Sequence, residues 1–445
     1  MIFAKHALLP SGWAENVRLT QAAGQLTAVA PGSRVAPGDV RVDALVPGMP
    51  NVHSHAFQRG FSGLTETRGT GPDSFWTWRE TMYRLALSVT PEDVQALAEM
   101  AYVEMLEAGF TRVGEFHYLH HDTDGGRYAD PAELSLRIFA AAQETGIALT
   151  HLPVFYAHGG FGPVAADAGQ RRFLHDPTAF ATLVAGCVAL LDRPQDRVGW
   201  APHSLRAVTG GELAELCAAL PGRIVHLHIA EQQREVTECR TALGARPVEW
   251  LLDNAPVGPR WCLVHATHLT GAETARLADS GAVAGLCPVT EANLGDGLFP
   301  APDFLSRGGR IAIGTDSNLR IDVAEELRLL EYGQRLHHQQ RNVLARPGGS
   351  TGHRLFVEAA KGGAQALDAP SPELAEGAPA DMVALHDPHG AATGGDQMLD
   401  RWIFGRDVAV SDVWAAGRHL VRDGAHVARA RIAEQFARVL RRAPL

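Results

Sequence analysis

Eight apolar, strand-like runs recur along this chain of 445 residues, and helix-like segments separate most of them. The runs lie near residues 45, 112, 150, 199, 226, 263, 284 and 312. Strands that alternate with helices predict parallel βαβ units, and eight such units predict a (β/α)8 barrel of the TIM type. A doubly wound open sheet is the alternative, but its ligands would gather at one crevice instead of around the whole set of strands.

The helices between these runs carry recognisable start signals. Thr90 is a typical N-cap, and Pro91 with two acids after it predicts a helix that ends at Gly109. Further helices are predicted over residues 131–145, 177–191, 211–220, 247–254, 271–280 and 323–336. Residues 60–90, by contrast, suggest a long aromatic loop that could fold over a site as a lid.

Both ends of the chain consist of short strand-like pieces that turns separate. They are predicted over residues 4–9, 16–19, 25–29, 381–385, 408–410, 413–416 and 419–421, with a terminal helix over 428–442. Because both ends share this pattern of short strands and turns, we predict one small β-sandwich domain built from residues 1–48 and 376–445. Residues 49–375 then form the barrel.

Composition excludes several classes of function. The chain is 46% apolar and 20% charged, as expected of a globular protein. A formal net charge of −10 without a basic stripe argues against nucleic-acid binding. No apolar run approaches the length of about 18 residues that a membrane span needs. Five widely spaced cysteines without a C-x-x-C pair indicate free thiols in a reducing cytoplasm.

Two histidines stand where the first barrel strand is expected to end, in the segment PNVHSHAFQR. Because side chains alternate along a strand, His53 and His55 would point to the same face. Two neutral imidazoles on one face can form half of a metal site. A surface turn that happens to carry two histidines is the alternative interpretation.

The fifth and sixth strands end in further candidates. The segment HLHIAE places His226 and His228 on one face, and spacing alone does not decide which of them could bind a metal. Glu231 lies past the strand end, where a carboxylate beside an activated water could shuttle protons. After the sixth strand we favour His265 over His268, because it lies nearer the strand end.

Asp316 follows the eighth strand, where a carboxylate could bind zinc or orient an attacking water. Each motif is weak alone, since a histidine at a strand end is more often structural and an aspartate after Gly-Thr is often a cap. All of them, however, fall on the C-terminal rim of one predicted barrel. This combination predicts a metal-dependent hydrolase.

These motifs, in this order, resemble the amidohydrolase superfamily, in its branch of mononuclear deaminases, over essentially the whole chain. The resemblance implies one Zn²⁺ per subunit. It also implies Glu231 and His265 as proton-handling and stabilising residues, and as metal ligands His53, His55, His228 and Asp316. Binuclear members have a carbamylated lysine after the fourth strand. Ala201-Pro202-His203 stands there instead, which favours one metal.

Five segments narrow the resemblance to the formimidoylglutamate deiminases: HSHAFQR, FWTWR, EFHY, APHSLR and HIAEQ. That family implies hydrolytic deimination of N-formimino-L-glutamate to N-formyl-L-glutamate and ammonia, in histidine degradation. It also implies a cytoplasmic homodimer. The implied substrate contacts are Gln58, Arg79, Tyr118, His203 and Arg206.

The chemistry of such a substrate agrees with the residues. It carries two carboxylates and one cationic formimino group, and Arg79 and Arg206 suit bidentate carboxylate binding. A surface ion pair is the commoner role of an arginine, and we expect one for Arg59. A deaminase acting on guanine or an adenosine derivative is the alternative function, but it would call for stacking surfaces and amide partners. A non-catalytic scaffold on the same barrel would have lost metal ligands.

Overall fold

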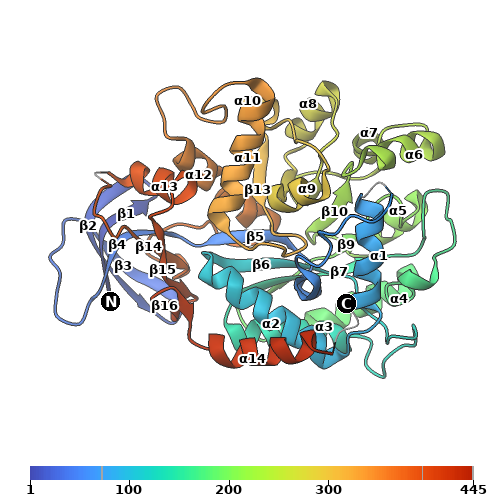
Figure 1. Ribbon diagram of the computed structural model, residues 1–445, viewed down its shortest axis with the longest axis horizontal. Coiled ribbons are helices and arrows are strands. Elements are labelled where there is room, and N and C mark those ends of the chain that lie inside the picture. Colours follow the sequence, from blue (N-terminus) through green and yellow to red (C-terminus); the bar gives the residue numbers. More distant parts are fainter. Residues whose placement is uncertain (72–73, 393, 443–445) are drawn as a thin grey trace.

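The computed structural model describes residues 1–71, 74–392 and 394–442. Figure 1 shows the first strands (blue) beside the last ones (orange to red) at one side of the molecule. The helices and strands from the middle of the chain make up the rest. No helix in the described ranges combines the length and apolar character that a membrane crossing requires.

The two ends of the chain share one sheet of eight strands. The N-terminal part supplies β1 (Ile2–Leu9), β2 (Gly12–Ala22), β3 (Gln25–Ala30) and β4 (Val40–Pro47). The C-terminal part supplies β14 (Met382–His386), β15 (Ala409–Ala415), β16 (Arg418–Arg422) and β17 (Ala425–His426). β4 and β14 pair antiparallel at the centre of the order β17-β16-β15-β14-β4-β1-β2-β3. The predicted β unit of both ends is thus confirmed as one continuous sheet.

Parallel strands form the second part of the fold. They are β5 (Met49–Ser54), β6 (Phe110–His117), β7 (Ala148–Phe155), β8 (Arg197–Val198), β9 (Ala201–Pro202), β10 (Val225–Ile229), β11 (Trp261–His265), β12 (Val283–Leu286) and β13 (Arg310–Ile313). β5 to β9 and β10 to β13 form two parallel sets, with β8 and β9 as two halves of the fourth strand. Parallel bridges join the sets between Trp200 and Val225 and between Ser54 and Asp316. The order is that of the predicted (β/α)8 barrel.

Two strand predictions were wrong. The apolar run near residue 45 belongs to β4 of the terminal sheet, and the first barrel strand is β5, which begins at Met49. Only Gly48 separates the two strands. The position requires a glycine, because a Cβ there would lie 2.1 Å from the hydroxyl oxygen of Thr111. The two pieces predicted around Ser411 are one strand, β15, whose register shifts within it.

Most predicted helices are confirmed within a few residues. They are α2 (Pro91–Glu107), α3 (Glu133–Thr145), α4 (Pro177–Ala189), α5 (Gly210–Ala219), α7 (Pro247–Asn254), α8 (Gly271–Ser280), α11 (Val323–His338) and α14 (Arg429–Leu440). Their N-caps work as the sequence indicates: the Thr90 hydroxyl accepts a hydrogen bond from the Asp93 amide at 3.2 Å. Further helices are α6 (Gln233–Leu243), α9 (Pro288–Leu294), α10 (Ala301–Ser306), α12 (Thr351–Ala366) and α13 (Gly395–Phe404).

The predicted aromatic loop over residues 60–90 is also corrected, because much of it is the helix α1 (Phe75–Ala86). Ser74 starts this helix: its hydroxyl accepts from the Trp76 amide at 3.3 Å, and its own amide donates to the Thr77 hydroxyl at 3.0 Å. This reciprocal cap satisfies amides that the first turn leaves free. The aromatic residues of the segment therefore lie on a regular helix.

We propose the domain boundaries that the sequence indicated, with residues 1–48 and 376–445 in one unit and 49–375 in the other. Two features support them: β4 ends at Pro47, and the last helix before β14, α12, ends at Ala366. The apolar cluster around Leu19, Leu45 and Met382 covers one face of the terminal sheet, whereas the larger core of the barrel continues onto the other face through Val46 and Val383.

Candidate active site at the C-terminal ends of the barrel strands

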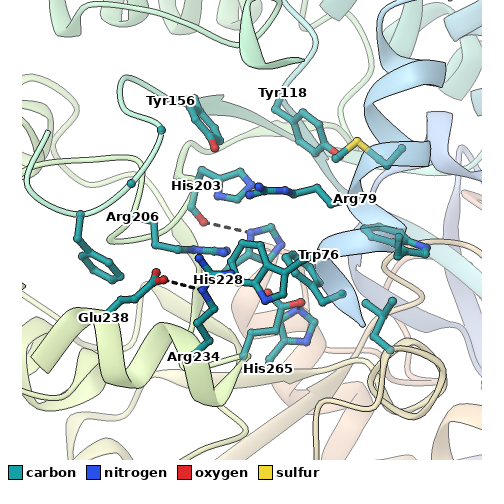
Figure 2. A pocket seen from close by; sticks show the side chains of 18 of the residues that line it. Trp76, Arg79, Tyr118, Tyr156, His203, Arg206, His228, Arg234, Glu238 and His265 are labelled. Carbon is teal, nitrogen blue, oxygen red and sulfur yellow. Dashed lines mark hydrogen bonds and ion pairs between the residues drawn. The ribbon is translucent and has the colours of Figure 1, made fainter. Parts of the chain in front are cut away.

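A cavity of about 480 Å³ opens where the parallel strands end. All of the site residues predicted from the sequence line it except His53, which lies buried directly beneath. Figure 2 shows Arg79 and Arg206 extending into this cavity from opposite sides of the view, with His203, His228 and His265 between them. The C-terminal rim of the barrel thus collects the side chains that the sequence singled out.

The backbone adopts a left-handed conformation at three of these strand ends. The φ angles are 50° at Ala230, 66° at His265 and 45° at Asp316, where each side chain carries a Cβ. Such conformations cost about 1–2 kcal/mol per residue and persist where the surroundings enforce them. At Asp316 the enforcement is visible: its amide donates to the His53 carbonyl at 2.9 Å, and its carbonyl accepts from the His55 amide at 2.9 Å.

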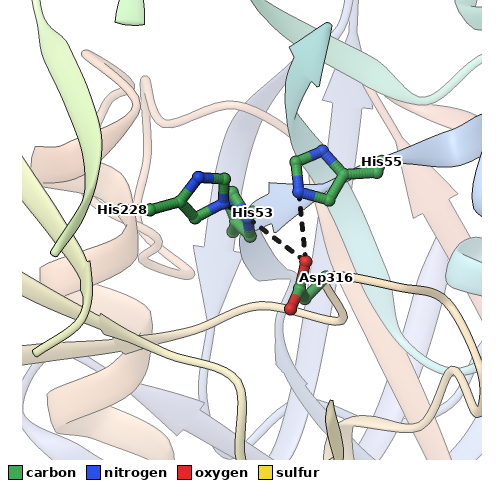
Figure 3. A group of neighbouring side chains, drawn as sticks. All are labelled: His53, His55, His228 and Asp316. Atoms are coloured by element: carbon green, nitrogen blue, oxygen red, sulfur yellow. Dashed lines mark hydrogen bonds and ion pairs between the residues drawn. The ribbon is translucent and has the colours of Figure 1, made fainter. Parts of the chain in front are cut away.

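Four side chains converge at the base of the cavity (Figure 3). His53 and His55 come from the end of β5, His228 from β10, and Asp316 from the segment after β13. The Asp316 Oδ1 atom lies 3.4 Å from His53 Nε2 and 3.2 Å from His55 Nε2. His228 Nε2 lies 2.9 Å from His53 Nε2. These distances make the cluster a candidate metal-binding site, as the sequence predicted.

The tautomers of two histidines support this assignment. His55 Nδ1 lies 2.9 Å from the Phe116 carbonyl, and His228 Nδ1 lies 3.1 Å from the His203 carbonyl. A carbonyl only accepts, so the Nδ1 atoms of both rings carry a proton, which leaves the Nε2 atoms to face the cluster. There the Nε2 atoms lie close to Asp316 and His53, an arrangement that a cation between them would stabilise. Carbonyl-oriented imidazoles of this kind are typical of metal ligands.

Burial keeps the ligands in the right ionisation state. It lowers the pKa of His53 to about 3 and that of His228 well below the usual value, so both rings are neutral near pH 7. Burial alone would raise the pKa of the Asp316 carboxyl, but the neighbouring His53 and His55 rings hold it well below its usual value. Neutral imidazoles and a carboxylate are the forms that bind a divalent ion.

A second group of possible ligands shares Asp316 with the first and adds His265 and Cys287. Burial raises the pKa of the Cys287 thiol well above its usual value. Burial would lower the pKa of His265, but Glu231, Glu291 and Asp316 raise it to about 10. A protonated thiol and a protonated imidazole are poor ligands. The first group is therefore the better candidate for holding a metal ion.

His265 lies between three acids. Its Nε2 atom is 3.9 Å from Glu231 Oε1 and 3.8 Å from Asp316 Oδ2, and its Nδ1 atom is 3.2 Å from Glu291 Oε1. Burial raises the pKa of Glu231, although the charge of His265 opposes this. A carboxylate with a raised pKa beside a protonated imidazole can accept and return a proton.

Glu291 is a residue that sequence reasoning missed. It is buried, and besides His265 it accepts a hydrogen bond from the Cys287 amide at 2.9 Å. It fixes which ring nitrogen of His265 faces the cavity. The available signal was an acid in the first turn of a helix after the seventh strand, in the segment CPVTE.

A buried polar network that the sequence also did not reveal joins two of the elements that carry candidate metal ligands, β5 and the segment after β13. Asn51 Nδ2 donates to the Thr315 hydroxyl at 2.7 Å, and that hydroxyl donates to Asn318 Oδ1 at 2.7 Å. Asn318 Nδ2 then donates to the Ser54 hydroxyl and to the Asp316 carbonyl, both at 3.1 Å. The network lies directly behind the ligands and fixes β5 against the segment that follows β13.

The predicted substrate contacts surround the cavity above the cluster. Gln58 Nε2 donates to the Tyr118 hydroxyl at 2.7 Å, while Gln58 Oε1 is buried without a partner. His203 Nδ1 lies 3.1 Å from the Ser204 hydroxyl, and burial lowers the pKa of His203 well below its usual value. These groups are neutral hydrogen-bonding partners for a polar ligand.

The two predicted arginines have no ion pair or hydrogen bond with any described residue. The Arg206 Nε atom is buried without a partner, an arrangement that costs free energy unless a ligand satisfies it. Burial would lower the pKa of Arg206, but the nearby charges of Glu235 and Glu231 raise it. Arg79 projects from α1, and its guanidinium lies over the rings of Trp76 and Tyr83. Both guanidiniums are therefore available to an anionic ligand.

The structure distinguishes the histidines between which spacing did not decide. His226 Nε2 lies 2.8 Å from the Ala366 carbonyl and so points away from the cavity, which leaves His228 as the candidate ligand from β10. His265 lines the cavity and His268 does not. Arg59 forms the expected salt bridge, with its Nε atom 2.6 Å from Glu104.

Comparison with known proteins agrees with this site. Residues 44–420 match the model of the Amidohydrolase family, and residues 1–43 match that of the formimidoylglutamate deiminase HutF, N-terminal domain. The chain is 52% identical over 448 residues to a formimidoylglutamate deiminase of Pseudomonas aeruginosa, a match that covers 99% of this chain and 98% of the relative. A 5-methylthioadenosine/S-adenosylhomocysteine deaminase of Natronomonas pharaonis is 27% identical over 80% of this chain and 77% of its own.

Solved structures show the same fold. The crystal structure of an amidohydrolase from Brucella melitensis has a TM-score of 0.98 and 52% identity, and the match covers 100% of this chain and 99% of the other. An adenosine deaminase from Xanthomonas campestris has a TM-score of 0.78 at 23% identity, over 99% of this chain and 98% of the other. With the metal cluster and the barrel on which it lies, these matches show that the chain belongs to the amidohydrolase family.

Proposed function

We propose that this protein hydrolyses N-formimino-L-glutamate to N-formyl-L-glutamate and ammonia, and that it uses one zinc ion per chain. The observation that carries the proposal is one cavity that contains both a group of candidate metal ligands and two guanidiniums without hydrogen-bond or ion-pair partners among the described residues. A dicarboxylate with a hydrolysable amidine fits both features. The relative from Pseudomonas aeruginosa, which is 52% identical over nearly the full length, supports the same substrate.

Zinc is the proposed ion because three imidazole nitrogens and one carboxylate oxygen are donors that it prefers. The ligands would be His53, His55, His228 and Asp316. When bound, the ion lowers the pKa of a water and supplies hydroxide near neutral pH. Neutral His53 and His228 suit this role, since neither must lose a proton first.

Glu231 is the proposed proton carrier. Its carboxylate takes the proton of the attacking water and passes it to the formimino nitrogen, which leaves as ammonia. His265, which holds its proton because acids surround it, and Asp316 orient the water and stabilise charge as the formimino carbon becomes tetrahedral. The short separations among these three side chains support this division of roles.

Arg79 and Arg206 are the proposed partners of the two substrate carboxylates. A guanidinium binds a carboxylate through two parallel N–H donors, and neither arginine has a competing acid in contact. The Gln58–Tyr118 pair and His203 then supply neutral hydrogen bonds to the rest of the substrate. We also propose the setting that the family resemblance implies: a cytoplasmic homodimer in histidine degradation. All five cysteines are free, which suits a reducing compartment.

The test is to supply zinc-loaded protein with N-formimino-L-glutamate and, separately, with guanine, and to measure ammonia release. We expect turnover of the formimino substrate. Release from guanine alone would overturn the proposal in favour of the alternative deaminase.

A variant tests the carboxylate clamp. Arg206→Ala should lower kcat/KM about 100-fold, since hydrogen bonds between charged groups contribute roughly 1.5–3 kcal/mol each, while the metal content stays the same. Arg276→Ala is the control, because that exposed arginine of α8 pairs with Asp253 outside the cavity. If both variants kept wild-type kinetics, Arg206 would have no part in substrate binding.

A further inference from the structure

Trp76 lies among three guanidiniums at the wall of the cavity (Figure 2). The guanidinium carbon of Arg234 is 4.2 Å from the centre of the indole, that of Arg79 is 4.7 Å away, and that of Arg206 is 5.6 Å away. The four residues come from α1, from the loop between β9 and α5, and from α6. One aromatic ring thus connects three separate elements of the cavity wall.

The spacing within α1 places Arg79 between two rings. Trp76, Arg79 and Tyr83 follow one another at intervals of three and four residues, so they share one face of the helix. The Arg79 guanidinium carbon lies 4.7 Å from the Trp76 ring and 5.3 Å from the Tyr83 ring. The aromatic face of α1 is therefore the surface that sets the direction of this arginine.

An aromatic face holds a guanidinium differently from an acid. It attracts the cation through the ring quadrupole, and it neither neutralises the charge nor uses up the paired N–H donors at the guanidinium edge. Arg234 shows the contrast: its side chain is 60% exposed and its Nε atom is 2.6 Å from Glu238. Arg79 and Arg206, which have no acid in contact, keep their charge and their donors for a ligand.

We propose that Trp76 is a positioning residue that holds Arg79 and Arg206 ready for the carboxylates of the ligand, an inference that rests on the proposed function. An arginine side chain loses rotamer entropy when it is fixed, so fixing it in advance strengthens binding. Trp76 does not belong to the cluster of Glu231, His265 and Asp316 that handles the protons. Its loss should therefore weaken substrate binding and leave the chemical step nearly unchanged.

The test compares Trp76→Leu with Trp76→Phe in the zinc-loaded protein. The binding probe is glutarate, a dicarboxylate without a formimino group, measured by calorimetry beside the steady-state kinetics of N-formimino-L-glutamate. Trp76→Leu should weaken glutarate binding and raise KM about tenfold while kcat stays within about twofold. Trp76→Phe, which keeps an aromatic face, should stay within about threefold of the wild type.

Several results would overturn the inference. Equal effects of the leucine and phenylalanine variants would show that apolar packing alone matters. A fall in kcat at unchanged KM would place Trp76 in the chemical step. Trp78→Leu is the matched control, because Trp78 also lies on α1 and lines the cavity, but its indole packs on Phe61 and Phe75 and on no guanidinium of the described residues. An equal loss of glutarate affinity there would indicate general damage to α1.

These measurements can refute the proposed substrate and the proposed role of Trp76 independently of each other. A wild-type protein that binds glutarate with the expected ranking of variants, but releases no ammonia from N-formimino-L-glutamate, would refute the substrate and support the role of Trp76. A wild-type protein that does not bind glutarate at all would refute the role of Trp76.

Discussion

Replacing Asn318 by alanine should damage the metal site without removing a ligand. Asn318 is fully buried, and its amide makes three hydrogen bonds: it accepts from Thr315 at 2.7 Å and donates to Ser54 and to the Asp316 carbonyl, both at 3.1 Å. Ser54 follows one proposed metal ligand, His53, and Asp316 is another. The substitution therefore removes hydrogen bonds that hold β5 and the segment after β13 in place next to the candidate ligands.

The magnitude follows from these contacts. A buried hydrogen bond contributes about 1 kcal/mol net, so three of them predict a loss of about 3 kcal/mol in the free energy of unfolding of the metal-free protein. Groups that orient metal ligands typically change metal affinity 10–100-fold when they are removed. We expect an effect of that size on zinc affinity, because Asp316 keeps its left-handed backbone only while its surroundings enforce it.

Two measurements check this prediction. Urea unfolding of the metal-free protein gives the stability change, and zinc titration against a competing chelator gives the affinity. Asn254→Ala is the matched control, since that exposed asparagine makes one hydrogen bond, to the Trp250 carbonyl, and should change stability by less than about 0.5 kcal/mol. A variant that loses stability but binds zinc as tightly as the wild type would refute the reasoning and leave the network a purely structural role.

Three further predictions concern stability. Gly362→Ala should lower the free energy of unfolding, measured with urea, by at least about 1–3 kcal/mol, because its Cβ would lie 1.9 Å from the Ile311 carbonyl oxygen. Gly211→Ala is the control: its Cβ would enter open space, so the variant should be as stable as the wild type or more stable. Burial lowers the pKa of His175 from 6.5 to about 4, so the unfolded chain binds its proton first as the pH falls, and stability should drop between about pH 6.5 and pH 4. That drop reaches about 1.4 kcal/mol per pH unit, and a urea midpoint whose pH dependence is unchanged in His175→Phe would contradict it. Chelating the metal should lower the Tm. Adding zinc at about 1,000 times its Kd should then raise the free energy of unfolding by about 4 kcal/mol, and an unchanged Tm would argue against a bound ion.

Local signals predicted the parts of this protein that depend on local physics. Helices with threonine caps and proline at the first position were found, because a cap lies within three residues of the amide it satisfies. The strand ends were found because parallel strands bring their C-terminal residues to one rim. The start of β5 was missed, since the apolar residues on both sides of Gly48 form one run in the sequence although they belong to two sheets.

The missed site residues depend on partners that lie far along the chain. Glu291 matters because it meets His265, 26 residues earlier, and Asn318 because it meets Ser54, 264 residues earlier. Nothing in the neighbourhood of either residue distinguishes it from an ordinary helix acid or turn asparagine. The helix α1 was missed for a different reason: its cap pairs Ser74 with Thr77 instead of the usual glutamate, and its aromatic residues suggested loop packing.

The pairing of β4 with β14 has a consequence for how the chain folds during synthesis. β4 ends at Pro47, and its neighbour in the sheet begins at Met382, so most of the protein must be made before the two strands can meet. At a synthesis rate of about 5–20 residues per second, this edge of β4 remains unpaired for roughly 15–70 seconds. During that time the N-terminal strands present an unpaired edge, which other chains could join. The sheet formed by the two ends of the chain is therefore completed only after most of the barrel has been synthesised.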